Sequence, residues 1–391
     1  MAPPIVRSGA LATAGDFAIN PDQIVVDMRD DVYQYDGGMS PLLLLVTGPK
    51  RRLRQVIPAT APTVQHLEDD VLPEWDTTTA SATSGAASLS VANADRHRGG
   101  DLLRNPRTGE IVRVIDVNEG AGTLQVSRAW VGAGTAMNNG DTLINLGAAE
   151  MEGDVSPVAK STVTVTKTNF CQIVRTPVHV TKTAENTKLY GGNERMRQRR
   201  KAGEKHARIW EQICLHGGKK LDTTTGQGAI RSAGGIDEHI TTNVLAAGGT
   251  LTEAEFIDFV GDVNRYSVRP GNRRKLLISS RELTATISSW GSNKLQTNVG
   301  AKQEYGIEVS TYVTPFGTLD IVNHPLLEVG YAGYGYMLDL DGVIWRPARG
   351  TEFMTNIQAA GEDAFKDEYL TEGSFTFALE KCFGKITGIT F

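Results

Sequence analysis

The seven histidines and three cysteines are the residues best suited to bind a metal or attack a substrate, and they are scattered along the chain. Structural zinc sites are built from closely spaced ligand pairs. His216 follows Cys214 by two positions, but the Gly217-Gly218 pair after it is typical of a helix end rather than of a ligand loop. We therefore expect no metal site and no disulfide framework.

The motifs that bind phosphate or activate a nucleophile are also missing. The string nearest to a phosphate-binding loop, Gly217 to Lys220, lacks the leading glycine and the hydroxyl that contacts Mg²⁺. There is no G-x-S-x-G and no H-E-x-x-H. Adjacent acids such as Asp69-Asp70 are typical of a solvated surface. The sequence predicts a protein that is not an enzyme, with no catalytic residue and no cofactor.

Composition indicates an ordinary globular protein with room for two or three domains. The chain has 391 residues, of which 40% are hydrophobic and 22% charged, with a net charge of −5. This balance excludes a globally basic nucleic-acid binder but not a local basic face. The longest aliphatic run, Leu42 to Val46, is too short to span a membrane. No signal peptide is expected, and the scattered cysteines favour a reducing compartment.

The first 58 residues have no clean periodicity and are interrupted by prolines. Their apolar patches have no local partner, so we expect them to be buried on the rest of the chain or on a neighbouring copy. The residues of these patches that we expect to contact another subunit are Ile24, Val25, Leu43 and Leu44. Residues 77–88 are rich in Thr, Ser and Ala, which favours a flexible linker.

Residues 95–147 are predicted to form a separate module, a small β-barrel. Short β-branched segments at 101–104, 110–117, 123–128 and 142–146 are separated by turn signals such as Asn105-Pro106 and Asn139-Gly140. The flanking stretches 77–88 and 147–157 are expected to act as hinges.

A long helix is predicted over residues 193–216, about 35 Å in length. Asn193 is a suitable N-cap and Gly217 a suitable end. One face carries an apolar stripe, with residues at helical spacing: Met196, Gly203, Ala207, Trp210 and Cys214. The other face is strongly basic: Arg195, Arg197, Arg199, Arg200, Lys201, Lys205 and Arg208.

A mixed α/β unit follows. Capping boxes at Thr252 to Glu255 and at Ser279 to Glu282 predict two helix starts, with a buried strand at 275–279 between them. Strands are expected at 307–313 and 318–322, then a β-rich end in which Asp341-Gly342 forms a hairpin turn.

This order of elements, together with local motifs, resembles the major capsid proteins of tailed bacteriophages, which share the Hong Kong 97-type shell fold. One motif is the Val64 to Asp70 string, VQHLEDD. A second is Asn169-x-x-Gln172-Ile173-x-Arg175-x-Pro177-x-x-Val180, just before Thr183-Ala184-Glu185 and the long helix. The similarity covers nearly the whole chain.

The resemblance implies an α+β protein with the following parts. Residues 1–58 would be an N-terminal arm, and 59–168 an extended loop that contains the 95–147 module. Residues 169–250 and 326–391 would form a peripheral domain with the 193–216 spine helix, and 251–325 an axial domain. The implied function is assembly into hexamers and pentamers of an icosahedral head around double-stranded DNA, with no membrane contact. A separate scaffolding protein, a portal and decoration proteins are the implied partners.

Two sets of site residues follow. Arg197, Arg200 and Lys201 are expected to face packaged DNA on the inner side of the shell, unless this face is simply solvated or is neutralised by acids of a neighbour. Leu67 and Trp75, large apolar groups in a polar stretch, are expected to contact another subunit. The alternatives are an encapsulin-like compartment shell, a tail or baseplate protein, or an unrecognised enzyme. If the protein is a capsid protein, we expect it in the virion after assembly in the host cytoplasm.

Overall fold

The computed structural model describes residues 56–153, 159–187, 192–224, 228–269, 271–293 and 310–390. Ile24, Val25, Leu43 and Leu44 therefore lie outside the described residues. The chain divides into two compact units, one from Leu67–Lys167 and the other from the described parts of Met1–His66 and Thr168–Phe391. The chain passes between them through two paired strands, β1 (Thr63–Glu68) and β8 (Val165–Phe170). No helix of the described residues is long and apolar enough to span a membrane.

The larger unit contains a three-stranded antiparallel sheet whose order is β17-β18-β9. Its strands are β9 (Gln172–Thr181), β17 (Val343–Met354) and β18 (Ala364–Phe377). β9 pairs with β18 without interruption from Gln172 opposite Gly373 to Thr181 opposite Ala364. Residues 56–59 follow the outer edge of β17, where the amide of Ile57 donates to the Trp345 carbonyl at 3.0 Å. The last residues before the extended loop thus pack on their own chain.

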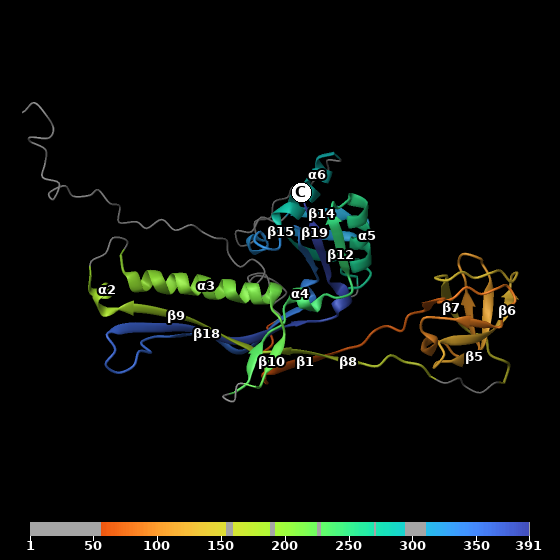
Figure 1. The fold of residues 1–391 in the computed structure, drawn as a ribbon, viewed down its shortest axis with the longest axis horizontal. Coiled ribbons are helices and arrows are strands. Elements are labelled where there is room, and N and C mark those ends of the chain that lie inside the picture. Colours follow the sequence, from red (N-terminus) through yellow and green to blue (C-terminus); the bar gives the residue numbers. More distant parts are fainter. Residues whose placement is uncertain are drawn as a thin grey trace, which may run out of the picture. The chain divides into compact units, whose positions relative to one another are not determined.

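The long helix α3 (Glu194–His216) runs alongside β9 and β18 (Figure 1). As predicted, the Asn193 side chain caps it by accepting from the Met196 amide, and the helix ends at Gly217. A side chain at Gly217 would lie 2.4 Å from the Ala233 carbonyl oxygen, so glycine is required there. The short helix α2 (Lys182–Asn186) precedes it.

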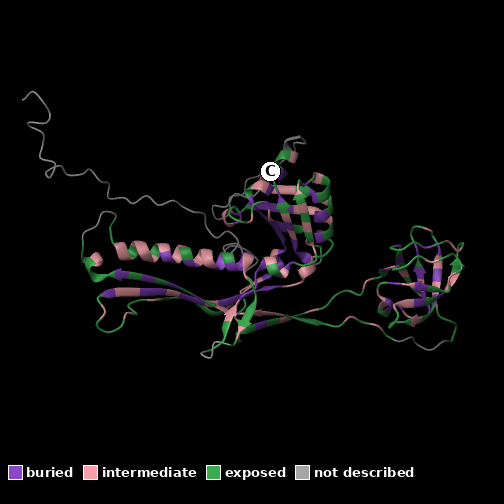
Figure 2. Ribbon diagram, viewed as in Figure 1, coloured by how far each residue is buried: buried purple, intermediate pink, exposed green. Residues whose placement is uncertain are grey.

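The predicted apolar stripe of α3 is only partly correct. Met196 is 68% exposed, whereas Ala202 and His206 are buried. The buried face instead follows positions 202, 206, 210, 213 and 214 (Figure 2). The sequence pattern missed His206 because its burial depends on polar partners from two strands, not on its hydropathy.

His206 joins the helix to both strands beneath it. Its Nδ1 lies 2.9 Å from Thr176 Oγ1 of β9, and its Nε2 lies 2.8 Å from Thr371 Oγ1 of β18. Burial lowers the pKa of His206, so the ring is neutral at pH 7. One ring nitrogen then donates a hydrogen bond and the other accepts one. The hydroxyls of Thr176 and Thr371 can play either complementary role.

The second sheet has six strands in the order β12-β19-β16-β13-β15-β14. These are β12 (Val244–Gly249), β13 (Arg274–Ser279), β14 (Ser310–Thr314), β15 (Gly317–Asn323), β16 (Gly335–Leu338) and β19 (Gly384–Ile389). The same part of the chain contains the helices α5 (Glu253–Asn264) and α6 (Arg281–Asn293). The short helix α4 (Ile236–His239) follows α3. A small hairpin is formed by β10 (Lys220–Asp222) and β11 (Ile230–Ser232).

Three predictions for this region need correction. The sheet takes β12, β16 and β19 from outside residues 251–325, because strand pairing joins segments distant in sequence. Asp341-Gly342 is not a hairpin turn: it belongs to a 3₁₀ turn, Leu340–Gly342, between strands of different sheets. The Thr252 capping box is confirmed, but the second helix is capped one residue later than predicted, by Ser280, whose Oγ accepts from the Leu283 amide.

α3 is tied to the six-stranded sheet by a fully buried pair, Glu211 and His324, whose Oε1 and Nε2 atoms lie 2.7 Å apart. His324 Nδ1 accepts from the Leu326 amide, at the start of the 3₁₀ turn Pro325–Leu327. A nitrogen that accepts carries no proton, so the proton is on Nε2 and is donated to Glu211. A further 3₁₀ turn, Glu380–Cys382, precedes β19.

The smaller unit is a β-barrel with the strand order β2-β7-β4-β5-β6-β3. Its strands are β2 (Trp75–Thr77), β3 (Ser88–Ser90), β4 (Asp101–Arg104), β5 (Ile111–Asn118), β6 (Thr123–Val131) and β7 (Thr142–Ala148), with a 3₁₀ turn at Ala94–Arg96. A bridge between Thr78 and Val91 joins the two outer strands and closes the sheet. The interior is aliphatic, with Leu103, Val112 and Leu143 fully buried.

The barrel therefore begins near residue 75, not 95, and the tract 77–88 is not a flexible linker. Within this tract the Ala82 amide donates to the Met137 carbonyl at 2.9 Å, and Arg128 Nη1 donates to the Thr83 carbonyl at 2.6 Å. Small Thr, Ser and Ala side chains are typical of linkers, but here they belong to strands and turns that pair with distant segments. Composition alone does not reveal such partners.

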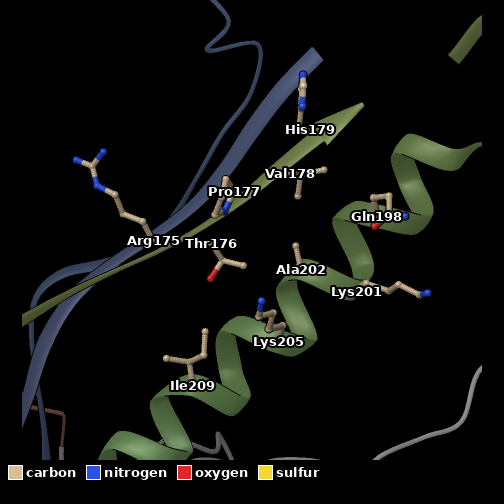
Figure 3. A pocket seen from close by; sticks show the side chains of 10 residues that line it. All are labelled: Arg175, Thr176, Pro177, Val178, His179, Gln198, Lys201, Ala202, Lys205 and Ile209. Atoms are coloured by element: carbon tan, nitrogen blue, oxygen red, sulfur yellow. The ribbon is translucent and has the colours of Figure 1, made fainter. Parts of the chain in front are cut away.

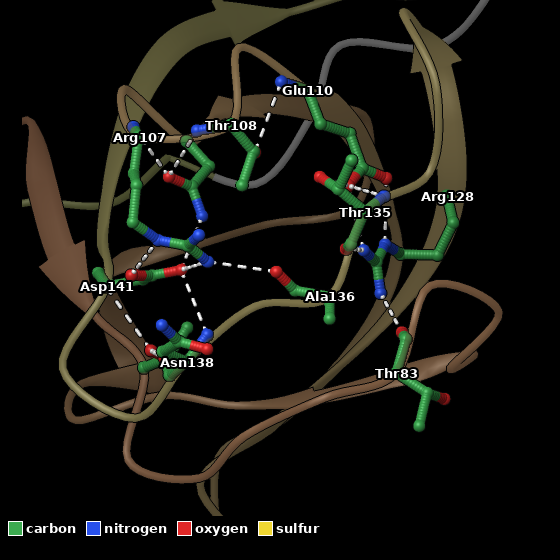
Figure 4. A network of polar contacts seen from close by, with 11 residues as sticks. Thr83, Arg107, Thr108, Glu110, Arg128, Thr135, Ala136, Asn138 and Asp141 are labelled. Carbon is green, nitrogen blue, oxygen red and sulfur yellow. Dashed lines mark hydrogen bonds and ion pairs between the residues drawn. The ribbon is translucent and has the colours of Figure 1, made fainter.

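Two bidentate ion pairs hold the turns of the barrel together (Figure 4). Arg128 contacts both carboxylate oxygens of Glu110, at 2.9 and 2.8 Å, and Glu110 also accepts from the amides of Ala129 and Thr135. Arg107 contacts both oxygens of Asp141, at 2.8 and 2.7 Å. Hydrogen bonds from Arg107 and Asn105 outweigh desolvation and hold the pKa of Asp141 well below its usual range.

We expect Arg128→Ala to destabilise the barrel strongly. The Glu110 side chain is fully buried, and removing its partner leaves an unpaired charge, at a cost of about 3–5 kcal/mol. Hydrogen exchange of amides 111–131 should accelerate accordingly. Arg104→Ala, at an exposed barrel position, is the control and should leave exchange almost unchanged. Equal protection in both variants would contradict the assignment.

Candidate functional site

The basic residues of α3 divide into two groups with different partners. Arg195 and Arg199 turn toward Asp367 of β18, a residue that is 1% exposed. Arg195 contacts both carboxylate oxygens, at 2.9 and 2.7 Å, and Arg199 Nε lies 2.8 Å from Oδ2. Each guanidinium also covers an aromatic ring, Arg195 on Phe365 and Arg199 on Phe353. These two arginines therefore stabilise the packing of α3 on β18.

The carboxylate that they share is strongly stabilised in its charged form. Burial alone would raise the pKa of Asp367, but hydrogen bonds from Arg195 and Arg199 and from the Asn356 amide hold it well below its usual range. Asp367 is therefore an anion throughout the neutral range, matched by two cations that cannot deprotonate.

Of the three residues predicted to face DNA, Arg197 is paired within the helix. Its guanidinium contacts both oxygens of Glu194, one turn earlier, and this pair lowers the pKa of Glu194. Arg200 lies 3.3 Å from Glu204 in a pair that is largely exposed, and such pairs contribute little. Among the described residues, Lys201 makes no ion pair.

Lys201 is one of three cations that follow α3 at spacings of four and three, with Lys205 and Arg208. Such residues share one face of a helix. A cavity of about 320 Å³ between α3 and β9 is lined by ten residues (Figure 3): Arg175, Thr176, Pro177, Val178, His179, Gln198, Lys201, Ala202, Lys205 and Ile209. A second, of about 450 Å³, is lined by Lys201, Glu204, Lys205, Arg208, Ile209 and Gln212.

The strand contributes no cation to this surface. Figure 3 shows the Arg175 side chain directed away from the helix, as the alternation along β9 requires. The basic surface is thus Lys201, Lys205 and Arg208, whereas Arg200 pairs with Glu204. The sequence prediction placed Lys205 and Arg208 on the basic face of the helix but chose only Arg197, Arg200 and Lys201 to face DNA, although helical spacing groups Lys205 and Arg208 with Lys201. The surface can hold phosphate or carboxylate oxygens by charge.

The two predicted contact residues of the extended loop lie in the other unit. Leu67 is 68% exposed and Trp75, at the start of β2, is 48% exposed. The structure therefore places both at the surface of that unit. Among the described residues, no group of His, Cys, Asp and Glu side chains is arranged to hold a metal ion.

A long helix lying on a long strand pair, a separate six-stranded α/β sheet and an extended loop together define the Hong Kong 97-type shell fold. The solved capsid of cyanophage A-1(L) is similar, with a TM-score of 0.52, 10% identity, and coverage of 95% of this chain and 99% of that one. This likeness shows the fold, and the predicted α+β class is confirmed.

A family model described as SU10 major capsid protein matches residues 11–390, and the chain belongs to this family. The resemblance to phage major capsid proteins is thereby confirmed. A curated relative, the major capsid protein of Pseudomonas phage PaMx41, is 27% identical over 275 residues, which are 68% of this chain and 66% of that protein. The holo-SrpI encapsulin complex of Synechococcus elongatus PCC 7942 gives a TM-score of 0.41 at 8% identity, over 58% of this chain and 78% of that one.

Asp367→Asn tests the role of the two arginines. A carboxylate with a depressed folded-state pKa contributes stability above its unfolded pKa of about 3.9, and that stability is lost as the pH falls below it. We expect the variant to lose about 3 kcal/mol at pH 7, and the difference from wild type to shrink below about pH 4. Denaturant midpoints from pH 7 to pH 3 measure this.

The matched control is Asp363→Asn, in the turn before β18. The Asp363 side chain is 75% exposed and 3.4 Å from Lys182, so this change should alter stability by less than about 1 kcal/mol. A pH-independent deficit in the Asp367 variant would contradict the ion-pair assignment.

Proposed function

We propose that the chain self-assembles into the hexamers and pentamers of an icosahedral phage head that encloses double-stranded DNA. The observation that carries this proposal is the family match across residues 11–390. In this proposal the protein resides in the virion after assembly in the host cytoplasm, and it works with a separate scaffolding protein, a portal and possible decoration proteins.

The architecture supports this assignment of parts. The β17-β18-β9 sheet with α3 would be the peripheral domain, the six-stranded sheet the axial domain, and residues 67–167 with the barrel the extended loop. A shell subunit needs surface for several neighbours rather than a reaction centre. Exposed large apolar side chains such as Leu67, Val71 and Trp75 supply surface of this kind.

The α3 basic surface is proposed to face the packaged DNA. Lys201, Lys205 and Arg208 concentrate positive charge on one side of the helix, while the chain as a whole has a net charge of −5. Phosphate contacts of this kind are independent of base sequence, as packaging of a whole genome requires. Arg197 contributes less than the sequence indicated, because Glu194 neutralises it.

Electron microscopy of the expressed protein tests the assembly itself. Closed particles with five-fold and six-fold capsomers are the expected result. Tubes or stacked rings would indicate a tail protein, and a monodisperse monomer in the presence of its scaffolding protein would overturn the proposal.

Deleting residues 1–40 should leave the folded body intact but block assembly or weaken the shell. The apolar residues of this segment, among them Ile24 and Val25, gain most if they are buried between subunits, at about 25 cal/mol per Å² of apolar surface. The thermal midpoint of the unassembled protein and the yield of particles measure the two effects separately. Normal particles of unchanged thermal stability would contradict the arm's role.

Replacing Lys201 and Lys205 by Gln should weaken DNA binding and its salt dependence. Each phosphate contact adds about 0.9 to the slope of log K against log salt, so the slope should fall by roughly 1.8. The control is Lys220→Gln on β10, an exposed lysine that lines neither of the two cavities. A particle reconstruction with Lys201 on the outer surface would end the proposal.

A further inference from the structure

The outer face of the barrel carries a continuous row of residues, four exposed and one (Ile111) half-buried, that crosses five adjacent strands. The pairing registers place Trp75 opposite Ile144, Ile144 opposite Arg104, Arg104 opposite Ile111, and Ile111 opposite Val131. Residues paired directly across strands point to the same side of the sheet. These five residues, called here the barrel row, are therefore neighbours on one surface.

Four of the five residues in the barrel row are large and apolar, and they remain accessible to solvent. Trp75 is 48% exposed, Ile144 38% and Val131 55%. Leu146 on β7, at 52%, and Trp130 on β6, at 49%, extend the surface on either side. An apolar surface of this extent on a small domain is typical of an interaction site.

The row is not needed for the barrel's own stability. The interior is already filled by residues that alternate with the row along each strand, such as Leu103, Val112 and Leu143, all fully buried. The Thr78 to Val91 bridge closes the barrel, so the sheet offers no free edge to an added strand. A partner must therefore dock on the side chains of the row.

The charge of this surface disfavours pairing with itself. Its charged members are Arg104 in the row and Arg113 beside it, the latter lying over the Trp130 ring at 5.4 Å. The outward positions of β4 and β7, residues 102, 104, 142, 144 and 146, include no acid. Two copies of the row face to face would bring arginines together in an apolar contact, which is unfavourable. The partner must combine apolar and acidic residues.

A segment with this composition precedes the barrel in the same chain. Residues 67–72 read Leu-Glu-Asp-Asp-Val-Leu, in which Leu67 is 68% exposed and Val71 78% exposed around three acids. Among the described residues, none covers the Leu67 and Val71 side chains or the Trp75, Ile144 and Val131 side chains of the barrel row. We propose that the barrel row of one subunit binds segment 67–72 of a second copy.

Such a contact joins two different surfaces of the same protein, so it propagates from subunit to subunit and closes when the subunits form a ring. Its apolar residues would exclude water from the contact, while Arg104 and Arg113 meet the acids of the neighbour. The inference rests on the proposed shell assembly, because it needs neighbouring copies.

Disulfide trapping in assembled particles tests the contact. Two double variants are made, Ile144→Cys with Leu67→Cys and Ile144→Cys with Val71→Cys. The native Cys171, Cys214 and Cys382 are buried free thiols and do not compete. We expect mild oxidation to give a ladder of covalent oligomers in at least one double variant. The control replaces Ile144→Cys by Gln125→Cys, an exposed site at the other end of β6 from Val131, and should give monomer.

A charge exchange in the same background tests the chemistry. Arg104→Asp should reduce the yield of the ladder several-fold, and adding Asp69→Arg should restore it. Absence of a ladder in both double variants, dimers from Ile144→Cys alone, or no effect of Arg104→Asp would each overturn the inference while leaving the shell assembly standing. Failure of the wild-type chain to form particles would instead overturn the proposed function, and this inference with it.

Discussion

The packing of α3 on β9 and β18 requires a helix and a strand of nearly equal length. The 23 residues of α3 extend about 35 Å, and the ten residues of β9 about 33 Å. The buried residues of α3 begin at Ala202 and pack with the valines of β9, Val174, Val178 and Val180. A shorter helix would expose the valines of β9, and a longer one would leave its own apolar face in water.

Three polar contacts then fix where the helix sits along the strands. Asp367 receives Arg195 and Arg199 near the start of α3, His206 bridges two threonines at its middle, and Glu211 meets His324 near its end. A slip by one helical turn, about 5.4 Å, would break all three contacts and leave buried charges unpaired. Apolar packing supplies the driving force, and these buried polar groups select a single register.

The features that depend on short stretches of sequence were predictable. Asn193 and Gly217 marked the ends of α3, Thr252 marked the start of α5, and the β-branched segments marked most barrel strands. The errors concern partners distant in the chain. No feature of the sequence around Arg195 indicates that its guanidinium pairs with Asp367, 172 residues later, and so does not contribute to the basic surface. Likewise, the buried environment of Thr78 comes from Asn138 and Asp141, so a Thr-rich strand was mistaken for a linker.

The first and last strands of the barrel are neighbours, since β2 begins at Trp75 and pairs with β7, which ends at Ala148. The chain thus enters the barrel at Trp75, one strand spacing, ~5 Å, from Ile144 of the last strand, and leaves it four residues further along that strand. A segment with adjacent ends is easily gained, lost or exchanged by recombination, because the parent loop closes over the gap without strain. The barrel can therefore be gained or replaced as a unit during evolution. Its sequence is then constrained by the surface that binds its partner and not by the packing of α3.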